Sequence, residues 1–386
     1  MRRIYLDNAA TSFPKPDAVY DAIDRYNRQV GASERGNYAS GTQATAAVRG
    51  CRSRLARLFG IESQADRLIF THNGTDSLNI ALHGLLAAGD HVVTSALEHN
   101  SVVRPLHELK LRHGVETTVV DADATGRVDP AVFARALRPS TKLVVLVHAS
   151  NVTGAVLPIA EVGEIARRAG VLFLVDAAQT AGQLPINLGD LPVDVLACPG
   201  HKGLLGPLGT GVLYVGPDAS ERMASFRQGG TGTESEDEMQ PAALPYKYES
   251  GNNNVPGIAG LEAGAAWLLE RDIASVHQHE KQLVERLLSG LAGLAGVRLY
   301  GPAAGADRVG VVSLTIDGFD PHELAGILNQ SFGIEVRAGL HCAPGAHRSI
   351  GTFESGGTLR ISTGPFTTAD EIDATLDALR QIAGST

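Results

Sequence analysis

The sequence predicts an α/β protein in which a large domain with a mainly parallel sheet precedes a small α+β C-terminal domain. Two observations support this prediction. A chain of 386 residues is longer than one hydrophobic core usually organises. Short apolar runs also alternate with helical patterns, which is typical of parallel strands that are joined by helices and buried on both faces.

The large domain is predicted to begin after a short strand and turn at residues 5–14. Helices are predicted at 16–30, 42–59, 76–87, 101–112 and 159–169. Strands are predicted at 67–70, 91–94, 117–120, 142–147 and 171–175, followed by apolar runs at 193–198 and 211–215.

The small domain is predicted from a change of pattern after a polar, glycine-containing stretch at 229–240, which we interpret as an exposed loop. One long helix is expected over 257–294, then a strand at 309–316, a helix at 321–330, an irregular stretch and a closing helix at 368–382. The predicted limits are 15–258 for the large domain and 1–14 with 259–386 for the small one.

Composition excludes several classes of protein. A net charge of −9 without a Lys/Arg-rich face argues against nucleic acid as a partner. No apolar run approaches the roughly 20 residues that a membrane span needs, and the first residues do not read as a signal peptide. Three cysteines without metal-type spacing argue against disulfides and a metal site. We therefore expect a cytoplasmic protein.

Lys202 is the first candidate for chemistry. It follows His201 in a segment of glycine and apolar residues between two apolar runs. Desolvation disfavours the charged form of a lysine and lowers its pKa. Such an amine suits Schiff-base chemistry with an aldehyde, although a single lysine at a strand end more often extends its charge into water.

Other polar residues follow predicted strands at the edge where open parallel sheets bind ligands. Gly74 and Thr75 open a helix whose N–H groups suit a phosphate, although an ordinary cap by Thr75 or Asp76 is the commoner reading. Asp176 ends the most apolar strand, and a carboxylate there needs a cation or donors. Gln179 follows it. His99 offers a flat ring for stacking; the alternative is a hydrogen-bonded structural histidine.

Seven motifs along nearly the whole chain resemble the class V aminotransferase-like enzymes that depend on pyridoxal phosphate, and within them the cysteine desulfurases and selenocysteine lyases. The motifs are Leu6-Asp-Asn-Ala-Ala-Thr11, Glu98-His99, Ser150-Asn-Val-Thr-Gly154, Val175-Asp-Ala-Ala-Gln179, Gly200-His-Lys202, Arg337-Ala-Gly-Leu-His-Cys342 and Leu359-Arg-Ile-Ser362. The resemblance implies pyridoxal-phosphate fold type I.

The resemblance also implies roles for these residues. Lys202 would carry the cofactor as a Schiff base and move the Cα proton, Asp176 would pair with the ring nitrogen, and Arg360 would bind the substrate carboxylate. Gln179 would bond the ring hydroxyl, and His99 would stack on the ring and take part in catalysis. The phosphate would be bound by Gly74, Thr75 and His201. Substrate or cofactor would be contacted by Asn8 and Asn151.

Cys342 is matched to the cysteine that forms a persulfide in this family, in the short form of its SufS-like members. We expect a mobile loop in which Arg337 and His341 are positive neighbours that favour the thiolate. Cys51 and Cys198 are interpreted as small core residues.

The chain departs from the family pattern at three positions. Pro199 stands where many relatives have a serine before Gly-His-Lys, and it has no hydroxyl for the phosphate. Asn252 stands where relatives have a threonine that reaches the phosphate of the partner subunit, and we expect Asn252 to bind the cofactor phosphate of the partner in its place. Tyr38 stands where relatives often carry a histidine, at a position that concerns substrate handling.

The function implied is conversion of L-cysteine to L-alanine, with transfer of sulfur to Cys342 and then to an acceptor protein, as in iron–sulfur cluster assembly. A homodimer is expected. The alternatives are a selenocysteine lyase acting on L-selenocysteine, and another class V C–S lyase or epimerase. A binding module without enzyme activity would leave Lys202, Asp176 and Arg360 without a role.

Overall fold

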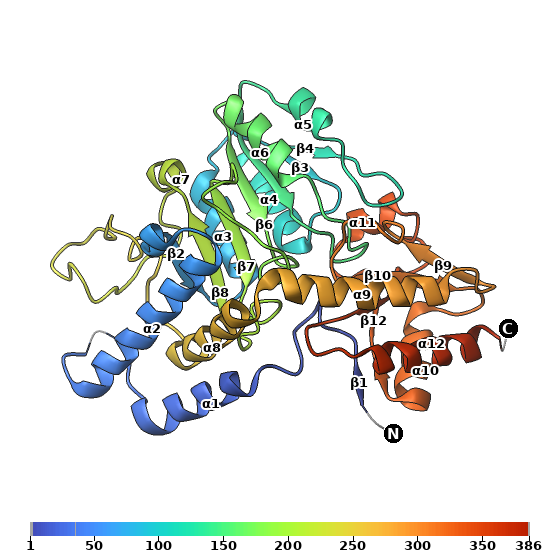
Figure 1. The fold of residues 1–386 in the computed structure, drawn as a ribbon. Coiled ribbons are helices and arrows are strands. Elements are labelled where there is room, and N and C mark those ends of the chain that lie inside the picture. Colours follow the sequence, from blue (N-terminus) through green and yellow to red (C-terminus); the bar gives the residue numbers. More distant parts are fainter. Residues whose placement is uncertain (1–2, 35, 385–386) are drawn as a thin grey trace.

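A mostly parallel sheet forms the centre of the larger part of the molecule (Figure 1). The fold comes from a computed structural model that describes residues 3–34 and 36–384. Within these residues the sheet has seven strands, in the order β2 (Leu68–Thr71), β8 (Gly211–Val215), β7 (Val195–Pro199), β6 (Leu172–Asp176), β5 (Thr141–Val147), β3 (His91–Ser95) and β4 (Glu116–Val120). Strand β8 runs opposite to the other six strands, which share one direction. The predicted α/β class is confirmed.

Alternating side chains of the central strands enter two separate apolar cores. In β6, for example, Phe173 and Val175 belong to one core, while Leu172 and Leu174 belong to the other. Both faces of the sheet are therefore covered, as the continuous apolar runs predict. The helices of this part are α1 (Asp17–Arg25), α2 (Ala39–Leu58), α3 (Gly74–Leu85), α4 (Asn100–His113), α5 (Pro130–Ala136), α6 (Ile159–Arg168), α7 (Pro217–Arg222) and α8 (Val255–Arg271). A π-helical turn, Tyr26–Val30, extends α1.

The smaller part contains an antiparallel sheet with a core of its own (Figure 1). Its strand order is β12 (Arg337–Gly339), β13 (Thr358–Ser362), β10 (Val311–Ile316) and β9 (Val297–Tyr300). Next to it, β1 (Ile4–Tyr5) pairs in parallel with β11 (Ile334–Glu335). The helices are α9 (Ile273–Leu291), α10 (Pro321–Phe332), α11 (Pro344–Ser349) and α12 (Ala369–Ala383). The N-terminal strand thus lies beside residues more than three hundred positions away.

The prediction of one helix over 257–294 is wrong. The segment forms α8 and α9, which meet at Asp272, where the backbone has a φ of 67°. That left-handed conformation cannot continue a helix, and the Asp272 side chain accepts the N–H of Ala274 and caps α9. The irregular stretch expected after residue 330 also contains β11, β12, α11 and β13.

The domain limits predicted from the sequence stay a prediction, and residues 1, 2, 385 and 386 lie outside the described part of the chain. The apolar side chains of α8 pack in the larger core, and those of α9 divide between the two cores: Ile273 and Val276 in the larger, Leu283 to Leu291 in the smaller. No helix in the described residues is long and apolar enough to cross a membrane.

A buried carboxyl group in α9 makes stability depend on pH. Glu280 is 2% exposed, and its Oε1 has no hydrogen-bond partner among the described residues. Burial raises the pKa of Glu280 from 4.5 to about 8. The folded state therefore holds a proton that the unfolded chain releases, and stability falls as the pH rises from about 4.5 to about 8.

Replacing Glu280 by glutamine is expected to raise the free energy of unfolding by about 1–3 kcal/mol above pH 8, because it removes the charge that burial disfavours. Urea unfolding at about pH 5 and about pH 9 measures this effect, which should nearly vanish at the lower pH. The matched control is Glu270→Gln, at an exposed position in α8. An equal gain from Glu280→Gln at both pH values would contradict the account.

Candidate active site

A cavity of about 250 Å³ lies between the carboxyl ends of the parallel strands and the smaller sheet. Its lining brings together most of the residues singled out in the sequence: Gly74, Thr75, His99, Asn151, Asp176, Gln179, His201, Lys202, Cys342 and Arg360. These residues come from both parts of the chain. A ligand in the cavity would therefore contact both.

Lys202 follows β7, and Asp176 is the last residue of the neighbouring strand β6. Burial lowers the pKa of Lys202 to about 8, Asp176 opposes this shift, and Arg360 adds to it. The desolvated amine inferred from the sequence is thus present. Burial raises the pKa of Asp176, against the opposing effects of the Ala178 N–H, which donates to Oδ1 at 2.9 Å, and of Lys202.

Two of the histidines that line the cavity, His99 and His201, are held neutral. Burial, with a smaller contribution from Lys202, lowers the pKa of His99 and of His201 to about 4 each. The backbone N–H of Ser101 donates to His99 Nδ1 at 3.1 Å, so the neutral ring carries its proton on Nε2. His99 is also the N-cap of α4. Its ring therefore has a fixed tautomer and a fixed direction.

The start of α3 offers free backbone donors. The cap is Asn73, whose side chain accepts the N–H of Asp76 at 2.9 Å, rather than Thr75 or Asp76. The N–H groups of Gly74 and Thr75 have no partner within the helix, as is general in a first turn. Because both residues line the cavity, these donors and the helix dipole can hold an anion there.

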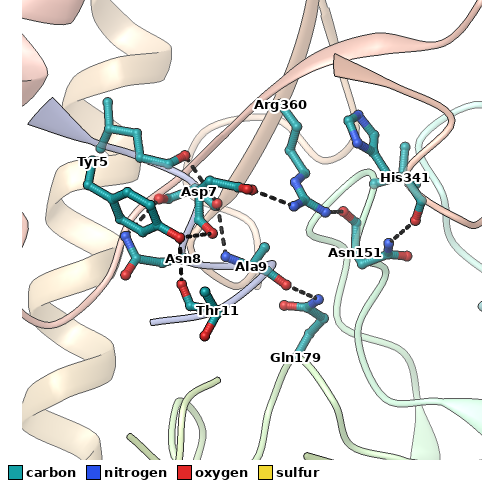
Figure 2. Close-up of polar contacts among 12 residues, drawn as sticks. Tyr5, Asp7, Asn8, Ala9, Thr11, Asn151, Gln179, His341 and Arg360 are labelled. Atoms are coloured by element: carbon teal, nitrogen blue, oxygen red, sulfur yellow. Dashed lines mark hydrogen bonds and ion pairs between the residues drawn. The ribbon is translucent and has the colours of Figure 1, made fainter. Parts of the chain in front are cut away.

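The guanidinium of Arg360 is held by a residue that the sequence reasoning did not single out. Arg360 Nη2 donates to Asp7 Oδ1 at 2.8 Å, and Nη1 donates to the backbone oxygen of Asn151 at 3.2 Å (Figure 2). Arg360 is 2% exposed, and its Nε has no partner among the described residues. A buried, oriented guanidinium with a spare donor can bind a carboxylate. Asp7 lies in the Leu6–Thr11 motif, and this motif was the sequence signal that could have identified it.

Cys342 is exposed and lines the cavity, whereas Cys51 and Cys198 are fully buried, as predicted. The expectation that His341 is a positive neighbour is wrong. Burial lowers the pKa of His341 to about 2, and its Nε2 donates to the backbone oxygen of Thr358 at 3.1 Å. Arg337 remains as a cation on the same cavity wall.

The backbone at Cys342 is tied to its surroundings. Asn151 Nδ2 donates to the His341 oxygen at 2.7 Å, as Figure 2 shows, and the Asn100 N–H donates to the Cys342 oxygen at 2.7 Å. Both His341 and Cys342 have positive φ, at 47° and 59°. Such strain persists only where surrounding contacts impose it, and it often marks functional sites. The expected mobility of this loop stays a prediction.

The segment after β1 fixes the peptide that precedes Lys202. The carbonyl oxygen of His201 accepts from the Ser12 N–H at 3.0 Å, Thr11 Oγ1 at 3.0 Å, Ser12 Oγ at 3.1 Å and Lys15 Nζ at 3.3 Å. Gln179 Nε2 donates to the Ala9 oxygen at 3.1 Å (Figure 2). This crowding of donors holds the start of the Lys202 loop in place.

Three residues expected at the site do not line this cavity. The amide of Asn8 is engaged with its own surroundings, because Nδ2 donates to the Ser362 oxygen and Oδ1 accepts the Phe13 N–H. Asn252 lines a separate small cavity near Arg227, and Tyr38 is 56% exposed at the start of α2. A contact by Asn252 would have to come from another chain, which stays a prediction.

Comparison with known families agrees with this geometry. The family model described as aminotransferase class-V matches residues 4–375. The chain therefore belongs to the class-V aminotransferase family, as its motifs predict. Several of its relatives are named cysteine desulfurase or probable cysteine desulfurase.

The similarity to these relatives extends over the whole chain. A "probable cysteine desulfurase" of Methanothermobacter thermautotrophicus is 36% identical over 386 residues, covering 99% of this chain and 95% of that protein. The solved apo structure of the cysteine desulfurase from Thermococcus onnurineus NA1 has a TM-score of 0.92 and 32% identity, covering 100% of this chain and 95% of that one. A cysteine desulfurase structure from Escherichia coli has a TM-score of 0.88 and 28% identity, covering 99% and 94%. The protein is a cysteine desulfurase-like enzyme, and the predicted fold is confirmed.

Proposed function

We propose that this protein is a pyridoxal-phosphate-dependent cysteine desulfurase, which converts L-cysteine to L-alanine and takes up the sulfur on Cys342. The observation that carries the proposal is the meeting of Lys202, Asp176, Arg360 and an exposed cysteine around one cavity. The first three residues suit binding and activation of an amino acid. Cys342 is what distinguishes a desulfurase from other reactions of the family.

The residues present fit pyridoxal phosphate. Lys202 offers an amine for the aldehyde, Asp176 a carboxylate for the ring nitrogen, and the start of α3 donors for the phosphate. His201 Nδ1 is buried and has no hydrogen-bond partner within the described residues, so the cavity leaves a polar atom for a ligand to satisfy. When bound, the cofactor withdraws electrons from the Cα of an amino acid.

The chain supplies the other parts of the reaction. Arg360 binds the substrate carboxylate. Because the pKa of Lys202 is lowered to about 8, a substantial fraction of its amine is neutral near physiological pH and can take the Cα proton. The carboxylate of Asp176 holds the proton of the ring nitrogen in place.

Sulfur transfer balances without an external oxidant. The Cys342 thiolate attacks the substrate sulfur, so a sulfur–sulfur bond forms as the Cβ–S bond breaks. The electron pair of the broken bond remains on the substrate carbon, which takes up a proton. L-Cysteine and the Cys342 thiol thus give L-alanine and a Cys342 persulfide.

A quantitative assay tests the proposal. Protein loaded with pyridoxal phosphate and incubated with L-cysteine and a thiol reductant is expected to release L-alanine and sulfide in equal amounts. D-Cysteine is the matched control, because its carboxylate and Cα proton cannot both meet Arg360 and Lys202. Cleavage of L-selenocysteine but not L-cysteine would favour the lyase, and racemisation without alanine would favour the epimerase.

We also propose a homodimer, and a sulfur-acceptor protein that serves iron–sulfur cluster assembly. The position of Asn252 supports the dimer, since its separation from the cavity of its own chain suits a contact with the phosphate bound by a second copy. The exposure of Cys342 supports transfer to an external acceptor.

A further inference from the structure

Two hydroxyl groups lie together on the cavity wall where α3 and α4 begin. Thr75 Oγ1 and Ser101 Oγ are 2.7 Å apart, and both residues line the cavity. Ser101 is 8% exposed. Their hydroxyls therefore stand beside the free N–H groups of the first turn of α3.

One residue beside this anion site, Pro199, offers no hydrogen-bond donor. Pro199, at the end of β7, carries neither a hydroxyl nor a backbone N–H. It packs closely on the start of α3, because a Cβ built on Gly74 would lie 3.1 Å from Pro199 Cδ. A phosphate bound here would receive no hydrogen bond from Pro199.

The hydroxyl proton of Ser101 is available for a ligand. Ser101 Oγ lies 2.8 Å from His99 Nδ1, and a hydroxyl can donate only once. However, His99 Nδ1 already accepts the backbone N–H of Ser101, at 3.1 Å. The hydroxyl can therefore turn to an anion without leaving the histidine unpaired.

We propose that Ser101 binds the cofactor phosphate and contributes the hydroxyl hydrogen bond that Pro199 cannot make. The proposal rests on the proposed binding of pyridoxal phosphate and adds a residue to it. Thr75 and the helix N–H groups bind the phosphate from one side. Ser101, in the first turn of the neighbouring helix α4, adds a hydroxyl donor from a second helix.

The test compares two ligands that differ only in the phosphate. Apo-protein carrying Ser101→Ala is titrated with pyridoxal phosphate and with pyridoxal, and binding is followed by absorbance. The dissociation constant for pyridoxal phosphate is expected to rise about tenfold or more, because a hydrogen bond to a charged group is lost. The constant for pyridoxal should change less than about twofold.

Further variants separate this role from a structural one. Ser101→Thr keeps the hydroxyl and should bind pyridoxal phosphate like the natural protein. Ser101→Cys has a weak donor of similar size and should lose affinity for pyridoxal phosphate. It serves as the test variant if Ser101→Ala folds poorly. In the double variant Ser101→Ala with Pro199→Ser, the hydroxyl returns on the other wall and affinity is expected to recover. Ser275→Ala, in the exposed first turn of α9, is the matched control.

Two results would overturn the proposal. One is an unchanged affinity for pyridoxal phosphate in Ser101→Ala. The other is an equal loss for both ligands, which would mean that Ser101 acts on the ring through His99. Failure of the proposed function is distinguishable, since it would leave this pattern of cofactor binding intact while no alanine formed from L-cysteine.

Discussion

Replacing Lys202 by alanine is expected to slow the turnover of L-cysteine by at least about 10⁴-fold, because one amine both holds the cofactor and moves the Cα proton. No other lysine lines the cavity within the described residues. The near-visible absorbance of the purified protein should be lost with the activity. Steady-state alanine formation and an absorbance spectrum measure the two effects.

The matched control is Lys142→Ala, because Lys142 lies in β5 with its side chain exposed. It should retain both activity and absorbance. If Lys202→Ala keeps the absorbance band and turns over L-cysteine at the natural rate, the proposed cofactor site is wrong.

Replacing Cys342 by alanine is expected to lower alanine formation from L-cysteine by at least about 100-fold, because the nucleophile that accepts the sulfur is lost. Addition of L-cysteine should still change the absorbance spectrum, since Lys202, Asp176 and Arg360 remain. The separation of binding from turnover is the signature of this role. Stopped-flow spectra and an alanine assay on the same preparation measure it.

Cys51→Ala is the control, since Cys51 is fully buried in α2 and does not line the cavity. It should keep its activity. Full turnover of L-cysteine by Cys342→Ala would instead favour a lyase that needs no thiol in the protein.

The large sheet could be predicted from the sequence because several of its strands, such as β5 and β6, contain continuous apolar runs followed by polar residues. The break at Asp272 could not, because the apolar pattern continues from α8 into α9 and the left-handed φ of one aspartate leaves no periodic signal. Strand β13 was missed for a different reason. It is held by pairing with β10 and β12, which no local pattern reveals.

The same distinction applies to the cavity. Lys202, Asp176 and His99 could be predicted because they follow strands of a parallel sheet, whose carboxyl ends meet at one edge. The ion pair of Asp7 with Arg360 joins residues 353 positions apart, and only folding brings them together. The sequence places His341 directly before Cys342 and so suggests a positive neighbour, but burial keeps the His341 ring neutral.

The persulfide on Cys342 is the most direct test of the central claim. Protein loaded with pyridoxal phosphate is incubated with L-cysteine, alkylated, digested and analysed by mass spectrometry. The account predicts one added sulfur atom on the peptide that contains Cys342 and none on the peptides that contain Cys51 or Cys198. Formation of alanine with no added sulfur on the Cys342 peptide at any time point would contradict it.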